Sequence, residues 1–198
     1  MSPHPRVGRE HILDIAEKLF TEHGYKSASI RSIASECGVT NAAIYYHFPD
    51  KESLFAEVIQ RHAESLREKM MRAGENITSP CEKLTAILNA YVNAIAGQHA
   101  PVFMLHRDAK YLKGHRKCRG KLMKSISQPL VDTLKLAQKN EAIKTIPSAG
   151  EDSAILLGML HGLAQQHRAT RKAETEKRAL SESDIQMVVN LFWAGVKI

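Results

Sequence analysis

Apolar residues recur every three to four positions along most of this chain, which is the spacing of one face of an α-helix. The first such stripe runs from Ile12 to Phe20, and Gly24 is placed to end the helix that it predicts. A similar stripe runs from Ile185 to Val196. No segment alternates apolar and polar residues for long enough to predict a strand. The pattern therefore predicts an all-α fold of about nine helices.

Helix-capping residues set the expected boundaries. A Ser, Thr or Asp side chain accepts a hydrogen bond from a free N–H group of the first turn, so these residues mark helix starts. The expected N-caps are Ser29, Thr40, Asp50, Ser79, Ser148 and Ser181. They predict two short helices up to residues 37 and 48, a long helix over 51–72, and three later ones. Two more helices are expected over 100–112 and 115–140.

The two short helices have the pattern of a helix-turn-helix. Gly38 lies between them, where a tight turn needs a positive φ. Ala34 is small where the two helices must cross closely, and Cys37 and Ile44 are apolar positions for the small core between them. This pattern favours a DNA-binding function, although short matches of this kind also occur by chance.

The residues around this turn sharpen the interpretation. The segment SIRSIASECGVTNAAIYYHFPDKESLF, residues 29–55, resembles the TetR family of bacterial transcriptional regulators. The positions that carry the resemblance are Ile33, Ala34, Gly38, Val39, Thr40, Tyr45, His47, Phe48, Lys51, Glu52 and Leu54. It implies a helix-turn-helix DNA-binding domain at residues 1–50 and a helical ligand-binding and dimerisation domain at residues 51–198.

The second short helix offers groups for reading bases. A helix that enters the major groove with its N-terminus forward presents its first residues to base edges. Asn41 can pair with adenine through two hydrogen bonds, and the methyl groups of Ala42 and Ala43 can contact a thymine methyl. The Thr40 hydroxyl, at the start of the helix, suits a phosphate.

The same helix ends in groups that suit the DNA backbone. Tyr45, Tyr46 and His47 can each donate a hydrogen bond to a phosphate oxygen, and Lys51 adds a positive charge just beyond them. For Tyr45 the alternative is an amphipathic lid over the small core. Ser29 and Arg31 are candidate backbone contacts from the first short helix. For Arg31 an ordinary solvated surface position is an equal alternative.

The TetR resemblance implies that the second domain forms a homodimer and binds a small-molecule effector. The expected dimer residues are Gly158, Gly162, Ile185, Val188, Val189, Phe192 and Trp193. The alternative is that the last helix packs only within its own subunit. The candidate pocket residues are Leu88, Tyr91, Phe103, Met104, Met123, Ile126 and Leu160, each of which also fits a solid core. A dimer predicts a palindromic double-stranded operator with two half-sites about 34 Å apart.

The net charge of +7 is concentrated in one place. Residues 107–124 hold eight Lys or Arg side chains and one acid, Asp108, whereas residues 1–51 hold six basic and six acidic side chains. Three interpretations of the basic run remain open: a site for an anionic effector, a field that favours DNA, and a solvated helix face. Because residues 1–51 carry no net charge, DNA binding through the N-terminus would have to depend on a few well-placed groups.

Cysteine and histidine usage adds one alternative. Three unpaired cysteines favour a reducing, cytoplasmic location, and the first ten residues lack a signal-peptide core. Cys118 lies among cationic neighbours that would lower a thiol pKa, so a redox-responsive regulator with Cys118 as sensor is the alternative function. No metal spacing, phosphate loop or catalytic constellation is found, so the sequence predicts no cofactor, no metal and no enzymatic activity. No apolar run is long enough for a membrane span.

Overall fold

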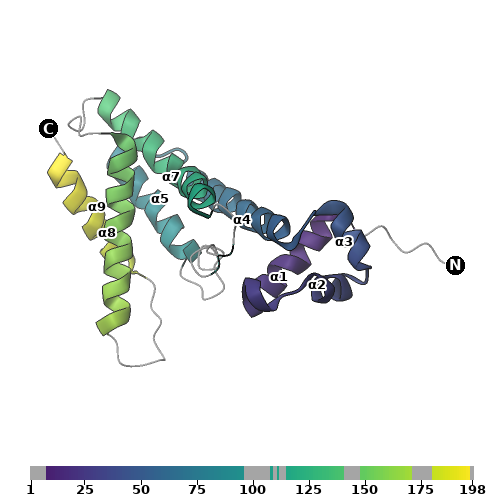
Figure 1. Ribbon diagram of the computed structural model, residues 1–198. Coiled ribbons are helices and arrows are strands. Elements are labelled where there is room, and N and C mark those ends of the chain that lie inside the picture. Colours follow the sequence, from purple (N-terminus) through teal and green to yellow (C-terminus); the bar gives the residue numbers. More distant parts are fainter. Residues whose placement is uncertain are drawn as a thin grey trace. The chain divides into compact units, whose positions relative to one another are not determined.

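Helix-forming stripes and their caps produce an all-helical chain, as predicted. The computed structural model describes residues 8–95, 108, 111, 115–140, 148–170 and 180–196, and these contain eight α-helices and no strand. The helices are α1 (Arg9–Ser27), α2 (Ile30–Cys37), α3 (Asn41–His47), α4 (Lys51–Ala73), α5 (Pro80–Ile95), α7 (His115–Lys139), α8 (Ala149–Thr170) and α9 (Glu182–Val196) (Figure 1). Most of the helix expected over 100–112 lies outside the described residues.

The predicted caps are formed. The hydroxyl oxygens of Ser29 and Thr40 accept from the backbone N–H groups of Ser32 and Ala43, at 3.0 and 3.3 Å. A carboxylate oxygen of Asp50 accepts from the first turn of α4 at 2.7 Å. Hydroxyl caps also begin the helices that follow Ser79, Ser148 and Ser181. These local bonds satisfy N–H groups that a helix start would otherwise leave free, which is why the boundaries were predictable.

Gly24 interrupts α1 where the sequence places a helix end. Its dihedral angles, φ 77° and ψ 163°, are not helical, and one more turn follows as far as Ser27. Gly24 is buried, and its carbonyl oxygen accepts the Ala28 N–H at 3.2 Å. The break frees the Tyr25 N–H from the helix, so this donor needs a partner from elsewhere.

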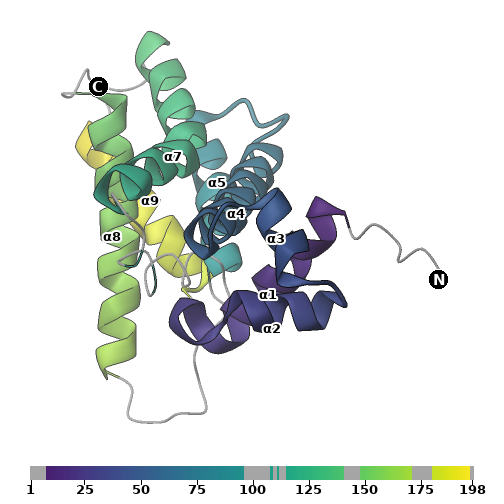
Figure 2. The ribbon, with the colours of Figure 1, turned by 45° about the vertical axis from the view of Figure 1, so that its right-hand side comes forward.

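The described residues fall into two compact units. The N-terminal unit comprises residues 1–64 and 98–122, and the C-terminal unit comprises residues 65–97 and 123–198. In the N-terminal unit, α1, α2 and α3 gather around the start of α4 (Figure 2). Phe20 and Phe55 meet edge to face there, with ring centroids 5.0 Å apart, and both are fully buried. The core of this unit therefore joins α1 to α4.

In the C-terminal unit, α9 packs against both α5 and α8. The buried face of α5 includes Leu84, Ile87, Leu88 and Tyr91. One face of α9 is buried against these neighbours, while its opposite face is exposed. Within the described residues, no helix is both long and apolar enough to cross a membrane.

Candidate nucleic-acid interface

The turn between α2 and α3 holds the two helices at a fixed angle. Gly38 adopts the left-handed conformation, with φ 69° and ψ 29°, which costs a side-chain-bearing residue about 1 kcal/mol or more. The Val39 N–H reaches back to the Ala34 carbonyl at 2.9 Å and closes the end of α2. Ala34 is only 2% exposed, because α2 is covered closely at this position. The turn thus has the geometry that a helix-turn-helix requires.

α3 is anchored by one fully buried side chain and exposes most of the rest. Ile44 is completely buried, and Phe48, the C-cap, is 1% exposed. Thr40, Asn41 and Ala42 are exposed at the N-terminal end of the helix, where base contacts are expected, and Ala43 is half-buried. The predicted reading residues therefore lie together at the free end of a helix whose other side is fixed in the core.

The aromatic groups at the other end of α3 differ in exposure. Tyr46 is 84% exposed and Tyr45 51%, so neither is a buried lid on the core. His47 is half-buried, and its ring meets that of Tyr46 nearly at right angles, with centroids 5.0 Å apart. On its other side the His47 ring lies 6.4 Å from that of Phe48. These neighbours restrict the imidazole, while the Tyr46 side chain extends into solvent.

Ser29, a candidate backbone contact at the start of α2, and Arg9 at the start of α1 both have structural roles. The Ser29 hydroxyl oxygen accepts a hydrogen bond from the Ser32 backbone N–H. The Ser32 hydroxyl oxygen accepts one from the Ser29 backbone N–H in return, which completes a capping box. Arg31 is exposed on α2. Arg9 pairs with Glu57, and its guanidinium lies 5.0 Å from the Phe48 ring centroid. Arg9 therefore stabilises the junction of α1 with α3 and α4.

The Lys51 side chain, expected to add a positive charge beside α3, folds back onto the ring of Tyr25. Its Nζ lies 4.3 Å from the centroid of the Tyr25 ring, and its side chain is half-buried. Burial lowers the pKa of Lys51, while the negative charge of Asp108 acts in the opposite direction. The ammonium therefore lies against the Tyr25 ring, within the electrostatic influence of Asp108.

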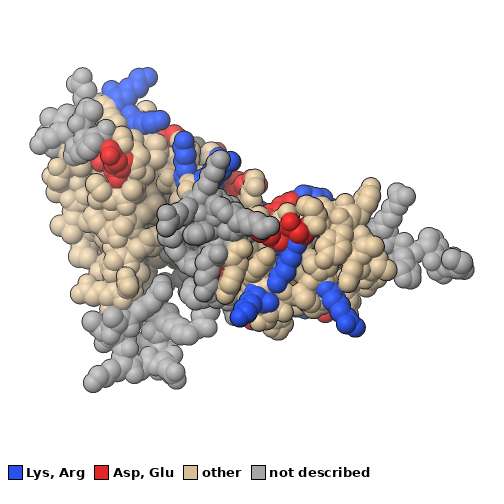
Figure 3. Space-filling model, in the orientation of Figure 1, with Lys and Arg blue, Asp and Glu red and all other residues tan. Residues whose placement is uncertain are grey.

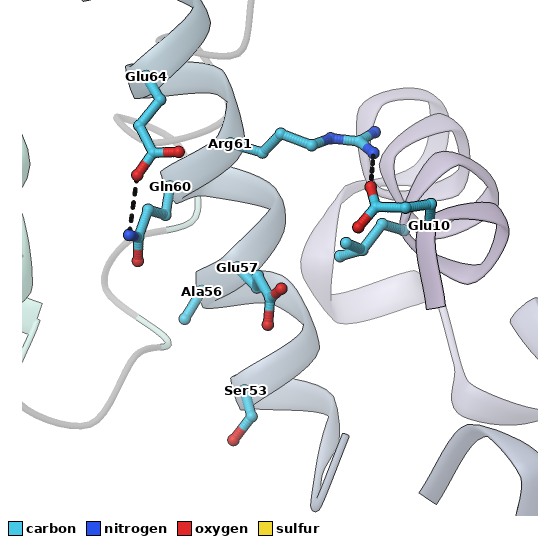
Figure 4. Close-up of a pocket in the computed structure, with 8 residues that line it drawn as sticks. Glu10, Ser53, Ala56, Glu57, Gln60, Arg61 and Glu64 are labelled. Atoms are coloured by element: carbon cyan, nitrogen blue, oxygen red, sulfur yellow. Dashed lines mark hydrogen bonds and ion pairs between the residues drawn. The ribbon is translucent and has the colours of Figure 1, made fainter. Parts of the chain in front are cut away.

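An ion-pair cluster between α1 and α4 was not predicted. Arg61 on α4 pairs with Glu10 at 3.5 Å (Figure 4). It also pairs with Asp14 at 2.8 Å and with Glu17. The three acids are spaced by four and three residues, so they share one face of α1, and that spacing is the only sequence signal of the cluster. We call these four residues the Arg61 cluster; it binds α4 to α1, the helix that precedes the helix-turn-helix.

Glu17 is the most perturbed acid of the Arg61 cluster. His62 Nε2 lies 3.2 Å from its Oε1, although this nitrogen has no well-aligned hydrogen-bond partner. The His62 imidazole lowers the Glu17 pKa most, burial opposes this effect, and the Arg61 guanidinium lowers it further, to about 2. Glu17 is therefore ionised at any pH near neutrality.

A shallow groove beside this cluster is unsuited to an anion. It is open to solvent and is lined by Glu10, Leu13, Ser53, Ala56, Glu57, Gln60, Arg61 and Glu64 (Figure 4). Three carboxylates and a single guanidinium face it, so a phosphate would be repelled. DNA is therefore expected at α3 and not in this groove.

Surface charge agrees with the balanced N-terminal sequence. On the face shown in Figure 3, Lys and Arg side chains over α1–α3 are scattered and do not form a continuous patch. Binding of a DNA backbone here would depend on individual donors on α3 and on helix N-termini.

Comparison with known proteins identifies this arrangement. Residues 12–58, from α1 into α4, match the family model described as "Bacterial regulatory proteins, tetR family". Residues 12–58 therefore carry the TetR-family N-terminal domain. It is 32% identical over 108 residues to the HTH-type transcriptional repressor KstR2 of Mycolicibacterium smegmatis, covering 54% of this chain and 53% of that protein. It is 45% identical over 60 residues to the HTH-type transcriptional regulator AcrR of Shigella flexneri, covering 30% and 28%.

The whole fold also matches solved TetR-family structures. A transcriptional regulator of this family from Mesorhizobium loti superimposes with a TM-score of 0.77 at 18% identity, covering 98% of this chain and all of that one. The sequence match to KstR2 spans about half of that protein's length. The chain therefore shares a fold with solved proteins over more of its length than it shares a sequence with KstR2.

Four of the seven predicted pocket residues are buried in the C-terminal unit. They are Leu88, Tyr91, Ile126 and Leu160, whereas Met123 is half-buried and Phe103 and Met104 lie outside the described residues. The Tyr91 hydroxyl lies 2.7 Å from His161 Nε2, and burial raises the pKa of Tyr91 to about 12. Sequence analysis missed His161 as a partner, because it lies 70 residues away along the chain.

The residues predicted for the dimer fall into two groups. Ile185, Val188, Val189 and Phe192 are buried within the chain itself, and Trp193 is half-buried. Gly158 and Gly162 on α8 are exposed, and a side chain added at either would meet open space. The exposed apolar residues nearby in sequence are Ile155 on α8 and Met187 and Leu191 on α9, at 51%, 46% and 61%.

The remaining candidate chemistry is limited. Among the described residues no group of three or more His, Cys, Asp or Glu side chains is arranged to hold a metal ion. Burial raises the pKa of both Cys37 and Cys81, which disfavours a reactive thiolate at either. The side chain of Cys118 lies outside the described residues.

Proposed function

We propose that this protein is a sequence-specific transcriptional repressor that binds a palindromic operator and is released from it by a small molecule. The observation that carries the proposal is α3. This helix buries Ile44 and exposes Asn41, Ala42 and the two tyrosines. Such an arrangement suits a recognition helix in the major groove, with its first residues at base edges and its last beside phosphates.

The proposed DNA contacts are divided between bases and backbone. Asn41, with Ala42 and Ala43, would read bases, and Thr40 would contact a phosphate. At the other end of α3, Tyr46 and His47 would donate to phosphates, with a smaller share for Tyr45 because it is less exposed. Ser29, Arg31 and Lys51 would contribute to the backbone contacts from the neighbouring helices. This division follows from the exposure of each group and the donors that it carries.

A homodimer would supply the second recognition helix. Gly158 and Gly162 leave two positions on the surface of α8 without side chains, which would let a partner helix approach closely. The exposed apolar residues Ile155, Met187 and Leu191 would add contact area. The buried residues Ile185, Val188, Val189 and Phe192 would support α9 from behind, with Trp193 at the edge. A two-fold axis through this face accounts for a palindromic operator.

The effector would bind in the C-terminal unit. Leu88, Tyr91, Ile126 and Leu160 come from three helices of this unit, and the Tyr91–His161 pair offers a polar group among them. An apolar molecule with one hydrogen-bonding group fits this chemistry. Residues 1–50 would then read DNA, and residues 51–198 would bind the effector and the second subunit.

A binding-site selection tests the proposal. Purified protein is incubated with randomised duplex DNA, the bound fraction is amplified over several rounds, and the enriched sequences are aligned. A palindromic consensus with half-sites one helical turn apart is expected. Absence of any enriched sequence would contradict the proposal. Repeating the binding assay after mild oxidation, with a Cys118→Ser variant as control, separates an effector-responsive protein from a redox-responsive one.

A further inference from the structure

A residue far along the chain caps the break in α1. The Tyr25 N–H, freed from the helix by Gly24, donates to Asp108 Oδ2 at 3.1 Å. Asp108 is only 5% exposed, and it is 83 residues from Tyr25 in the sequence. A buried carboxylate is costly unless it is hydrogen-bonded or near a cation. The Tyr25 N–H provides one hydrogen bond, and a cation lies over the ring of the same tyrosine.

That cation is Lys51. Its Nζ lies 4.3 Å from the centroid of the Tyr25 ring, a cation–π distance. The Tyr111 ring also stacks on Tyr25, with centroids 5.5 Å apart and ring planes 20° apart. Tyr25 therefore joins Lys51, Asp108 and Tyr111, and we call these four residues the Tyr25 junction.

The Tyr25 junction restricts the one cation that begins α4. Its ammonium is half-buried on the ring, and the Asp108 carboxylate attracts it, raising its pKa against the effect of burial. A DNA phosphate that binds Lys51 must therefore offset both the ring contact and the attraction of Asp108. Phosphate and carboxylate compete for the same ammonium.

We propose that Asp108 and Tyr111 restrain Lys51 in the DNA-free protein, so that their docking on Tyr25 weakens DNA binding. The inference rests on the proposed DNA binding by α3 and adds a control point to it. Asp108 and Tyr111 belong to the N-terminal unit but lie between α5 and α7 in the chain, and most of these two helices belongs to the C-terminal unit. Displacement of Asp108 and Tyr111 from Tyr25 would therefore alter the hold on Lys51.

A double-mutant cycle tests the restraint. Affinities for a non-specific duplex are measured by fluorescence anisotropy at several salt concentrations for the wild type, Asp108→Asn, Lys51→Met and the double variant. Asp108→Asn is expected to bind roughly three- to tenfold more tightly, with a salt slope steeper by about one, because Lys51 is released to a phosphate. In the Lys51→Met background the gain should disappear.

Two matched controls separate the restraint from general charge effects. Glu22→Gln removes one negative charge from an exposed position on α1, and its smaller effect should be the same with and without Lys51. Tyr111→Phe keeps the stacked ring and should bind as the wild type, whereas Tyr111→Ala should bind more tightly. If Asp108→Asn does not fold, Tyr111→Ala replaces it as the variant that releases Lys51. An equal gain from Asp108→Asn in both Lys51 backgrounds would overturn the inference.

A second measurement needs no DNA. Lysine acetylation by a dilute activated ester is followed by peptide mass spectrometry, and Lys51 should react several-fold faster in Asp108→Asn than in the wild type. Lys18, which pairs with Glu36 at 2.9 Å, is the internal control and should react equally in both. Unchanged labelling of Lys51 refutes the restraint. Faster labelling in a protein that binds no DNA supports the restraint and refutes the proposed function instead.

Discussion

At the scale of single residues, exposure distinguishes groups that the sequence presents side by side. Tyr45 and Tyr46 are neighbours on α3, but their exposed fractions are 51% and 84%. Tyr46 also holds His47 in an edge contact. The donors in this part of the chain are mostly neutral, so the affinity should depend on hydrogen bonds more than on charge.

Removal of the Tyr46 hydroxyl should therefore weaken DNA binding without changing its salt dependence. Tyr46→Phe is expected to cost about 0.5–1.5 kcal/mol of binding free energy on operator and non-specific DNA alike, because a phosphate contact carries no sequence information. Fluorescence anisotropy titrations at several salt concentrations measure both quantities. Tyr45→Phe is the matched control and should cost less. A loss confined to the operator would contradict a backbone contact.

Asn41 should determine a base preference. Asn41→Ala removes a side-chain amide that can pair with adenine through two hydrogen bonds, and it should relax preference at one position of each half-site by about 1–3 kcal/mol. Parallel binding-site selections with wild type and variant measure the change. Ser35→Ala, at an exposed position on α2, is a control that leaves α3 unchanged. An unchanged consensus would exclude Asn41 from base readout.

At the scale of elements, α1 and α4 are joined by the Arg61 cluster and by the aromatic core. The acids of the cluster lie 44 to 51 residues from Arg61 in the sequence, and they meet it on adjoining helices. Through this connection, the first part of α4 belongs to the N-terminal unit that contains α1, α2 and α3. A tilt of α4 would therefore carry α1 with it.

The Arg61 cluster should make stability depend on acidic pH. The Glu17 pKa is lowered from 4.5 to about 2 in the folded protein, so its contribution is complete above pH 4.5 and is lost as the pH falls towards 2. Urea unfolding of wild type and Glu17→Gln should differ by about 1–2 kcal/mol at pH 7, a value reduced for partial solvent exposure, and should converge towards pH 2. Glu36→Gln, in an exposed pair with Lys18, should leave stability nearly unchanged at every pH. A pH-independent difference would contradict the assignment.

Capping residues and apolar periodicity predicted most of the helices. Contacts between residues far apart in the sequence were not predicted. Ser29, Thr40 and Asp50 cap helices as expected, because a cap depends only on residues three positions away. The hydrogen bond from the Tyr25 N–H to Asp108 depends on the packing of two segments that are 83 residues apart, and the periodicity of the sequence does not indicate such packing. Lys51 was correctly expected at the start of α4, but its folded-back side chain depends on that same contact.

At the scale of the whole molecule, an apolar stripe indicates burial but not the partner that covers it. The stripe on α9 from Ile185 to Val196 is buried within the chain, so the sequence pattern alone did not distinguish a core from a dimer. The free apolar surface of this unit lies elsewhere, at residues such as Ile155 and Leu191. The proposed dimer therefore depends on this second face.

A charge on that face should separate the subunits. Leu191→Glu is expected to convert a dimer to a monomer in analytical ultracentrifugation with little loss of helical content, because Leu191 is 61% exposed within the chain. Operator affinity should fall by at least tenfold, since the two recognition helices no longer bind together. Leu136→Glu, at a 45% exposed position on α7, is the matched control. An unchanged sedimentation coefficient for Leu191→Glu would place the interface elsewhere.

The single anchor of α3 has an evolutionary consequence. Only Ile44 of its seven residues is fully buried, so most substitutions in this helix leave the core intact. A duplicated gene would therefore acquire a new operator through a few changes on α3 and would need no compensating mutations in the rest of the protein. Two copies of the gene could then come to regulate different genes while their proteins still share the same fold.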